Sequence, residues 1–332
     1  MLSEFDLIER YFSQPMRQLA ASYPQLKLGI GDDCALLQAS AGKQLAISSD
    51  MLVSGRHFFA DVDAASLGHK ALAVNLSDLA AMGARPLGFT LALALPELQP
   101  DWLAAFSQGL LSLAAASGCP LIGGDTTKGP LNISITVLGE VTPGQALRRA
   151  AAQAGDDIWV SGTLGGARLA LGALYGDYIL PAAIMQQSAE RLHRPQPRLA
   201  LGQALAGLAH AALDVSDGLL GDLGHILNAS GLAAEISLDA LPLADYLPEH
   251  APSTQAAYDF ALNGGDDYEL CFTAPVSARQ QLLQLAEACA TPISRIGKMR
   301  AGRPGDCKIW HADGREFISQ LASFDHFPKD SS

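Results

Sequence analysis

The stretch Lys70-Ala-Leu-Ala-Val-Asn-Leu-Ser-Asp-Leu-Ala-Ala-Met-Gly-Ala84 decides how the first half of the chain folds. It is rich in Ala and Leu, which are strong helix formers, and Gly83 followed by Pro86 marks a helix end. Asp63 or Ser66 can cap the start of this helix with a side-chain oxygen. The stretch therefore predicts one well-formed helix.

Asp78 is the single charged residue between Ala71 and Ala84. On a helix it shares a face with Val74 and Met82, which lie four residues away on either side. A carboxylate on such an apolar face is costly to bury unless it is paired or binds a cation. The alternative is an ordinary aspartate near a helix end that accepts backbone hydrogen bonds.

The composition is that of a folded protein of about two domains. The chain has 332 residues, of which 49% are hydrophobic and 17% are charged, and this excludes an intrinsically disordered class. Aromatic residues make up only 6%, so small aliphatic side chains must fill the core.

The charge and the cysteines exclude several classes of function. The formal net charge is −12 and no Lys/Arg cluster occurs, which argues against a nucleic-acid partner. The five cysteines form no CxxC pair, so neither a disulfide framework nor a zinc site is expected. Free cysteines of this kind predict a location in the reducing cytoplasm. The N-terminus lacks a signal pattern and no uncharged apolar run is long enough to span a membrane.

Strand and helix patterns alternate along the chain, and many of the strand patterns alternate in polarity. We therefore expect α+β layers in two domains rather than one doubly wound sheet. The turn-rich segment 142–155 suggests the boundary, giving domains at 1–145 and 146–332. Strands are expected at 26–30, 44–49, 87–95, 132–140, 157–162, 234–238, 269–273 and finally 293–297, and helices at 3–19, 101–117, 167–175, 184–192, 198–208, 219–230 and 278–290.

Aspartates recur at predicted strand or loop ends, next to Gly or Ser. They are Asp32, Asp33, Asp50, Asp78, Asp125, Asp214 and Asp217. If these loops converge, their carboxylates cannot all stay ionised without cations. Mg²⁺ is the cation expected here, because proteins usually hold it with a few carboxylates together with substrate phosphates. Taken singly, each of these residues is more often a turn former.

The common phosphate-binding motifs are absent. The chain has no G-x-x-x-x-G-K-[ST] loop and no protein-kinase signature. The turn 162–166 follows a predicted strand but lacks the G-x-G-x-x-G spacing of a dinucleotide site.

Six motifs follow one another along the chain. They are Gly29-Ile-Gly-Asp-Asp33, Ser48-Ser-Asp-Met-Leu-Val-Ser-Gly-Arg-His-Phe58, Val74-Asn-Leu-Ser-Asp-Leu-Ala-Ala-Met-Gly83, Gly123-Gly-Asp-Thr126, Asp214-Val-Ser-Asp-Gly218 and Gly264-Gly-Asp-Asp-Tyr-Glu-Leu270. This ordered set resembles the thiamine-monophosphate kinase family, from about Glu4 to Phe327. The family shares its fold with aminoimidazole ribonucleotide synthetase and selenophosphate synthetase. The resemblance implies two α+β domains, each a mixed sheet covered by helices, in a homodimer.

The resemblance also implies ATP-dependent phosphorylation of thiamine monophosphate to thiamine diphosphate with Mg²⁺. Its site residues fall into three sets. The metal ligands would be Asp33, Ser48, Ser49, Asp50, Asp78, Asp125, Asp214 and Asp217; the ATP contacts Gly124, Asp125, Arg149 and Ser216; and the substrate contacts His57, Asp266 and Phe324. Arg149 and Asp125 would act in catalysis. Asp266 replaces the Glu usual in the family, and Ser49 replaces a common Thr.

Two alternatives differ in class. One is a related ATP-using synthetase on the same scaffold, although the catalytic Cys or Lys expected near its N-terminus is not evident. The other is a regulator that binds nucleotide without turnover. Release of ADP with and without thiamine monophosphate separates these possibilities.

Overall fold

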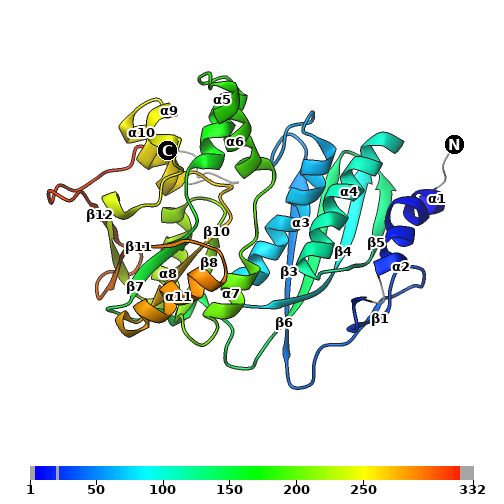
Figure 1. The fold of residues 1–332 in the computed structure, drawn as a ribbon, viewed down its shortest axis with the longest axis horizontal. Coiled ribbons are helices and arrows are strands. Elements are labelled where there is room, and N and C mark those ends of the chain that lie inside the picture. The colour runs from blue at the N-terminus through cyan, green and yellow to red at the C-terminus, as the bar shows by residue number, and fades with distance from the viewer. Residues whose placement is uncertain (1–3, 20–21, 322–332) are drawn as a thin grey trace, which may run out of the picture. The chain divides into compact units, whose positions relative to one another are not determined.

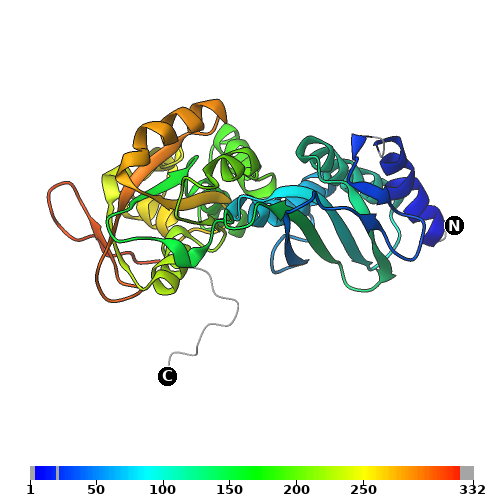
Figure 2. The same cartoon turned by 90° about the horizontal axis from the view of Figure 1, so that it is seen from below.

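The computed structural model describes residues 4–19 and 22–321 and forms two compact units. The first comprises Met1–Leu79 and Ala84–Ala146, and the second Ala80–Gly83 and Leu147–Ser332 (Figure 1). The assignment of residues 1–145 and 146–332 as domains stays a prediction. Each unit has its own sheet and its own helices (Figure 2).

The first unit is built on a four-stranded sheet of order β3-β6-β4-β5. Its strands are β3 (Gln44–Val53), β4 (Arg85–Leu95), β5 (Leu121–Lys128) and β6 (Asn132–Val141). β4 and β5 are parallel and the other pairs are antiparallel, so the sheet is mixed. The chain enters through α1 (Glu4–Ile8), a π-helical turn (Glu9–Ser13), α2 (Gln14–Leu19) and the small β1–β2 pair (Leu26–Leu28, Leu36–Leu37).

Helices α3 (Ala64–Ala81) and α4 (Pro100–Ser117) pack together against this sheet (Figure 1). They approach so closely that a Cβ on Gly109 would lie 1.9 Å from the Ala65 carbonyl oxygen. The predicted helix around Asp78 is confirmed, and Asp63 caps it by accepting the Ser66 N–H at 2.8 Å. The opposite face of β3 is exposed and apolar, because Leu45 and Ile47 project into solvent there.

Two predicted strand ends in this unit were wrong. β3 continues to Val53, so Asp50 lies inside the strand and not at its end. β5 runs from Leu121 to Lys128, so Asp125 also lies inside a strand and not at a strand or loop end. In both cases pairing with a neighbouring strand outweighs the local preference of Gly and Asp for turns.

The second unit contains a six-stranded mixed sheet of order β12-β9-β11-β7-β10-β8. Its strands are β7 (Asp157–Ser161), β8 (Ala211–Val215), β9 (Ala233–Ser237), β10 (Glu269–Ala274), β11 (Ile293–Arg300) and β12 (Cys307–Trp310). Only β12 and β9, among the pairs in this sheet, are parallel. The sequence predicted the strand beginning at residue 293 as the last one. This prediction was wrong, because β12 follows it.

Helices cover both faces of this sheet. They are α5 (Gly166–Tyr175), α6 (Ala182–His193), α7 (Leu199–Leu205), α8 (Leu219–Ser230), α9 (Leu247–His250), α10 (Thr254–Asn263) and α11 (Arg279–Ala288), of which α9 and α10 were not anticipated. Side chains of α8 pack with Ile158 and Val160, whereas those of α7 and α11 pack with Trp159 and Phe272. None of the helices within residues 4–19 and 22–321 is both long enough and apolar enough to cross a membrane.

Candidate active site

In the first unit, α3 is joined to β3 by polar side chains. Ser48 Oγ donates to Asp78 Oδ2 at 2.5 Å. Asn75 Oδ1 accepts the Asp50 N–H at 3.1 Å, and its Nδ2 donates to the Ala71 carbonyl at 3.0 Å. Asn75 is only 1% exposed, so it fixes the strand against the helix and holds the Asp50 backbone in place. The sequence analysis missed this role, although Asn75 lies three residues before Asp78.

The carboxylates of Asp50 and Asp78 repel each other across this junction. Burial, and then the charge of Asp78, raise the pKa of Asp50 to about 6. A cation between the two groups would relieve this repulsion. The donors here are all oxygen atoms, the type that Mg²⁺ prefers, so Ser48, Asp50 and Asp78 fit a magnesium site.

Ser49 and Asp125 lie elsewhere on the same sheet. The Ser49 hydroxyl donates to the Ile135 carbonyl at 3.1 Å and lies 3.0 Å from the Thr136 hydroxyl. Asp125 pairs in register with Ala92, one row away from Asp50. Because side chains alternate along a strand, both residues face away from α3.

Gly124 and Asp33 are the remaining predicted metal and ATP contacts in the first unit. A Cβ on Gly124 would lie 1.9 Å from the Leu91 carbonyl oxygen, so only glycine fits this position of β5. Asp33 is exposed, and its N–H donates to the Asp32 carboxylate at 2.9 Å. Within the part of the chain that the structure describes, no three His, Cys, Asp or Glu side chains come close enough to hold a metal by themselves.

His57 lies in a tight loop directly after β3. Its Nδ1 accepts the Val53 N–H at 3.0 Å, so the neutral ring carries its proton on Nε2. The Gly55 N–H donates to the Phe58 carbonyl at 2.9 Å and closes the loop. The loop therefore orients the imidazole.

In the second unit, the loop between β8 and α8 holds three predicted residues. Asp214 lies near the end of β8, and Ser216 and Asp217 follow it. Asp222 in the first turn of α8 accepts the N–H groups of Ser216 and Asp217 at 3.0 and 3.1 Å. Burial raises the pKa of Asp222 to about 7. Sequence reasoning missed Asp222; its signal was an aspartate in the first turn of a helix.

Asp266 lies beside this loop. Its N–H donates to the Ser216 carbonyl at 2.8 Å, so the structure brings these two predicted residues together. The neighbouring carboxylates of Asp267 and Glu269 bind partners within the second unit. Asp267 accepts the Gly165 N–H at 2.8 Å, and Glu269 pairs with two arginines.

Arg149 lies in a short 3₁₀ turn (Arg149–Ala151) and is exposed, as is Arg148. The Ser230 hydroxyl donates to the Arg149 carbonyl at 2.8 Å and fixes this turn to the end of α8. The last predicted residue, Phe324, lies outside the described residues.

Comparison with known proteins shows the family of this chain. Residues 31–141 match the family model of AIR synthase related protein, N-terminal domain, and residues 153–308 match that of its C-terminal domain. Thiamine-monophosphate kinase of Escherichia coli is 46% identical over 98% of both chains. The chain belongs to the thiamine-monophosphate kinase family. The predicted family and the two-domain α+β fold are both confirmed.

Two solved structures of the family resemble the chain throughout. The crystal structure of thiamine-monophosphate kinase from Stenotrophomonas maltophilia has a TM-score of 0.85 and 48% identity, covering 94% of this chain and 97% of that one. AaThiL complexed with AMPPCP and TMP has a TM-score of 0.75 and 29% identity, covering 98% and 97%.

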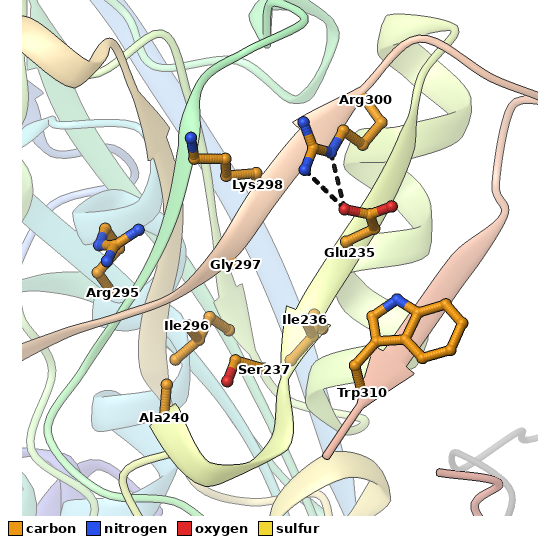
Figure 3. A pocket seen from close by; sticks show the side chains of 10 residues that line it. All are labelled: Glu235, Ile236, Ser237, Ala240, Arg295, Ile296, Gly297, Lys298, Arg300 and Trp310. Carbon is orange, nitrogen blue, oxygen red and sulfur yellow. Dashed lines mark hydrogen bonds and ion pairs between the residues drawn. The ribbon is translucent and has the colours of Figure 1, made fainter. Parts of the chain in front are cut away.

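Figure 3 shows one cavity of the second unit, of about 300 Å³, whose lining includes none of the residues that the thiamine-monophosphate kinase resemblance implies. It is lined by β9, β11 and Trp310, and by the cationic side chains of Arg295, Lys298 and Arg300. Arg300 is engaged by Glu235 at 2.7 Å and Arg295 by Asp157 at 3.6 Å. The cavity contains none of the predicted site residues, and two of its cations serve internal ion pairs.

Proposed function

We propose that this chain phosphorylates thiamine monophosphate to thiamine diphosphate, using ATP as phosphoryl donor and Mg²⁺ as metal. The observation that carries the proposal is full-length identity of 46% to a thiamine-monophosphate kinase. A relative of the same fold has been solved with AMPPCP, an ATP analogue, and TMP together. The Asp50–Asp78 pair supports the proposal, because two close carboxylates favour a bound cation.

Several Mg²⁺ ions would be held in the first unit. Ser48, Asp50 and Asp78 would hold Mg²⁺ on the side of the sheet that faces α3, and Asp33, Ser49 and Asp125 would hold separate Mg²⁺. In the second unit, Asp214 and Asp217 would be the metal ligands. When bound, the metal would neutralise charge shared by ATP and the acceptor phosphate. Asn75 and Asp222 set the backbone positions from which these ligands project.

The other site residues position the two substrates. The acceptor oxygen is already anionic, so the protein needs neither a nucleophile nor a strong base. Arg149 would provide a fixed cation against charge on the transferred group, and Gly124 and Ser216 would contact ATP. His57, Asp266 and Phe324 would contact thiamine monophosphate.

We also propose a homodimer formed through the open face of the first sheet. Along β3, Leu45, Ile47 and Met51 are 53%, 63% and 55% exposed. A row of large apolar side chains on a sheet face is typical of a buried interface.

The five free cysteines fit a cytoplasmic location.

The central test measures ADP release by the purified chain with ATP and Mg²⁺, with and without thiamine monophosphate. We expect release that depends on thiamine monophosphate, forms thiamine diphosphate in equal amount and stops with EDTA. A regulator would bind ATP without release, and a synthetase would need another acceptor; either result overturns the proposal.

Sedimentation tests the dimer separately. Ile47→Glu should yield monomers, because it places charge in the proposed interface. Ile179→Glu, at a 97% exposed position of the second unit, is the matched control and should stay dimeric. A wild-type monomer at micromolar concentration would overturn the dimer.

A further inference from the structure

The loop Gly264–Tyr268 holds two residues in an unfavourable backbone conformation. Asp266 has φ = 67° and Tyr268 has φ = 48°, both in the left-handed region that residues with a Cβ rarely adopt. Two such residues in one loop persist only where the surroundings fix them. The question is which contacts do so.

Backbone contacts hold the loop on one side. The Asp266 N–H donates to the Ser216 carbonyl and the Tyr268 N–H to the Val215 carbonyl, both at 2.8 Å. A Cβ on Gly265 would lie 2.6 Å from the Ser216 oxygen, so this close approach requires glycine. These contacts fix the loop to the end of β8.

Asp267 holds the loop on the other side. It lies between the two left-handed residues, is 1% exposed, and its Oδ2 accepts the Gly165 N–H at 2.8 Å. Gly165 caps the N-terminus of α5 and itself has φ = 82°. A buried carboxylate at a helix N-terminus is stabilised by the N–H groups that point toward it. Asp267 therefore joins the loop to the turn that starts α5.

Arg191 of α6 closes the connection. Its Nη2 donates to the Thr163 carbonyl at 3.2 Å, to the Asp267 carbonyl at 3.4 Å and to Glu269 Oε1 at 2.7 Å. One guanidinium thus contacts the turn before α5, the loop and the strand after it. Glu269 is fully buried and is also paired with Arg198, so Arg191 is itself fixed in place.

We propose that Asp267 and Arg191 form a clamp that holds the Gly264–Tyr268 loop in its left-handed conformation and thereby positions Asp266 for thiamine monophosphate. The proposal rests on the function proposed above for Asp266. Asp267 and Arg191 are positioning residues: they act through the loop and do not contact the substrate.

The experiment compares Asp267→Ala, Asp267→Asn and wild type in two measurements. The first is amide hydrogen exchange of the loop, which does not require activity. Loss of the carboxylate should raise exchange at residues 266 and 268 at least tenfold in Asp267→Ala. Asp267→Asn retains an oxygen that can accept the Gly165 N–H, so it should show a smaller increase.

The second measurement is steady-state kinetics. Asp267→Ala should raise KM for thiamine monophosphate about tenfold and change KM for ATP less than twofold, and Asp267→Asn should lie between. Asp156→Asn is the matched control. Asp156 is also buried and accepts the backbone N–H of Gln153, but it lies just before the start of β7, whereas the turn that Arg191 contacts follows the end of β7. It should leave exchange in the loop and both KM values unchanged.

The outcomes separate the clamp from the function. Unchanged loop exchange in folded Asp267→Ala overturns the clamp, whatever the kinetics. Raised exchange with an unchanged KM for thiamine monophosphate overturns the link to the substrate. If Asp267→Ala does not fold, the same criteria apply to Asp267→Asn and to Arg191→Lys. A wild type without activity on thiamine monophosphate refutes the proposed function alone, because the exchange result still stands.

Discussion

Two groups of acidic residues, one in each unit, are arranged in opposite ways. In the first unit, Asp50 and Asp78 lie close together between β3 and α3, with a serine hydroxyl between helix and strand. In the second, Glu269 is held by Arg191 and Arg198, at 2.7 and 2.5 Å. One arrangement gathers like charge, and the other neutralises it.

The pKa values of Asp50 and Asp157 follow this difference. Burial and the neighbouring carboxylate raise the pKa of Asp50. In the second unit, burial alone would raise the pKa of Asp157, but Arg279, followed by Arg295 and Lys298, holds it below its usual value. Like charges placed together destabilise the fold, so they indicate a cation-binding role, whereas the neutralised carboxylates indicate a structural one.

The largest effect that this comparison predicts is on Asp78→Asn. Loss of a metal-binding carboxylate should lower kcat by about 1000-fold, or roughly 4 kcal/mol. The variant should fold as stably as wild type, because the substitution also removes the repulsion of Asp50. ADP release at saturating substrates and thermal unfolding check both parts. Near-normal turnover at limiting Mg²⁺ would remove Asp78 from the site.

Glu269→Gln should mainly lower the stability of the fold, whereas Asp78→Asn should mainly lower turnover. Arg191 and Arg198 would lose their buried countercharge, at a cost of about 3–5 kcal/mol in the free energy of unfolding. Urea denaturation measures this change. Glu235→Gln is the control, because the Glu235–Arg300 pair is exposed on both sides and should contribute less than about 1 kcal/mol. Similar losses in the two variants would contradict the structural role of Glu269.

Arg149→Ala tests the cation that we place at the phosphates. It should lower kcat/KM for ATP about 30-fold, or roughly 2 kcal/mol, since a fixed positive charge would be lost from the transferring group. Arg148→Ala is the matched control, because both side chains are exposed and adjacent. Equal losses from the two substitutions would show that the double arginine acts only through general charge.

A smaller effect concerns pH. Burial raises the pKa of Asp267 to about 7, with Glu269 adding to the shift and Arg191 opposing it. Folding therefore favours the protonated form. The stability that this group contributes is fully present below its unfolded pKa of about 4 and is lost as the pH rises toward 7.

Asp267→Asn removes this titration. Urea unfolding from pH 5 to pH 8 should show wild type losing about 1–2 kcal/mol relative to Asp267→Asn, a modest figure because Tyr246, Arg191 and Glu269 are coupled to the same group. A constant difference between the two proteins across this range would assign Asp267 its ordinary pKa.

Local sequence was sufficient for some elements and not for others. The α3 helix and its Asp63 cap follow from residues adjacent in the chain. The ends of β3 and β5 do not, because strand pairing extends them through residues that favour turns. α10 and β12 were missed entirely.

The candidate site divides in the same way. Motifs that resemble a family named the ligands, but they gave no sign of the residues that hold those ligands. Asn75 accepts the N–H of Asp50, 25 residues away in β3, and Asp222 accepts the backbone N–H of Ser216. Neither contact belongs to a sequence motif, so the sequence alone did not predict it.

The smallest predicted effect concerns Asp266, where the chain departs from its family. Asp267 and Glu269 are buried inside the second unit, whereas Asp266 is only half-buried, so a cationic substrate can reach the Asp266 carboxylate. Asp266→Asn is the best test, because Asn tolerates the left-handed backbone of this position and loses only the charge. It should raise KM for thiamine monophosphate about fivefold, or roughly 1 kcal/mol, and leave KM for ATP unchanged. Asp266→Glu should bind as well as wild type, since it restores the residue usual in the family and retains the charge. If Asp266→Asn leaves both KM values unchanged in a folded protein, the shorter side chain does not reach the substrate even through a water molecule, and position 266 serves the turn alone.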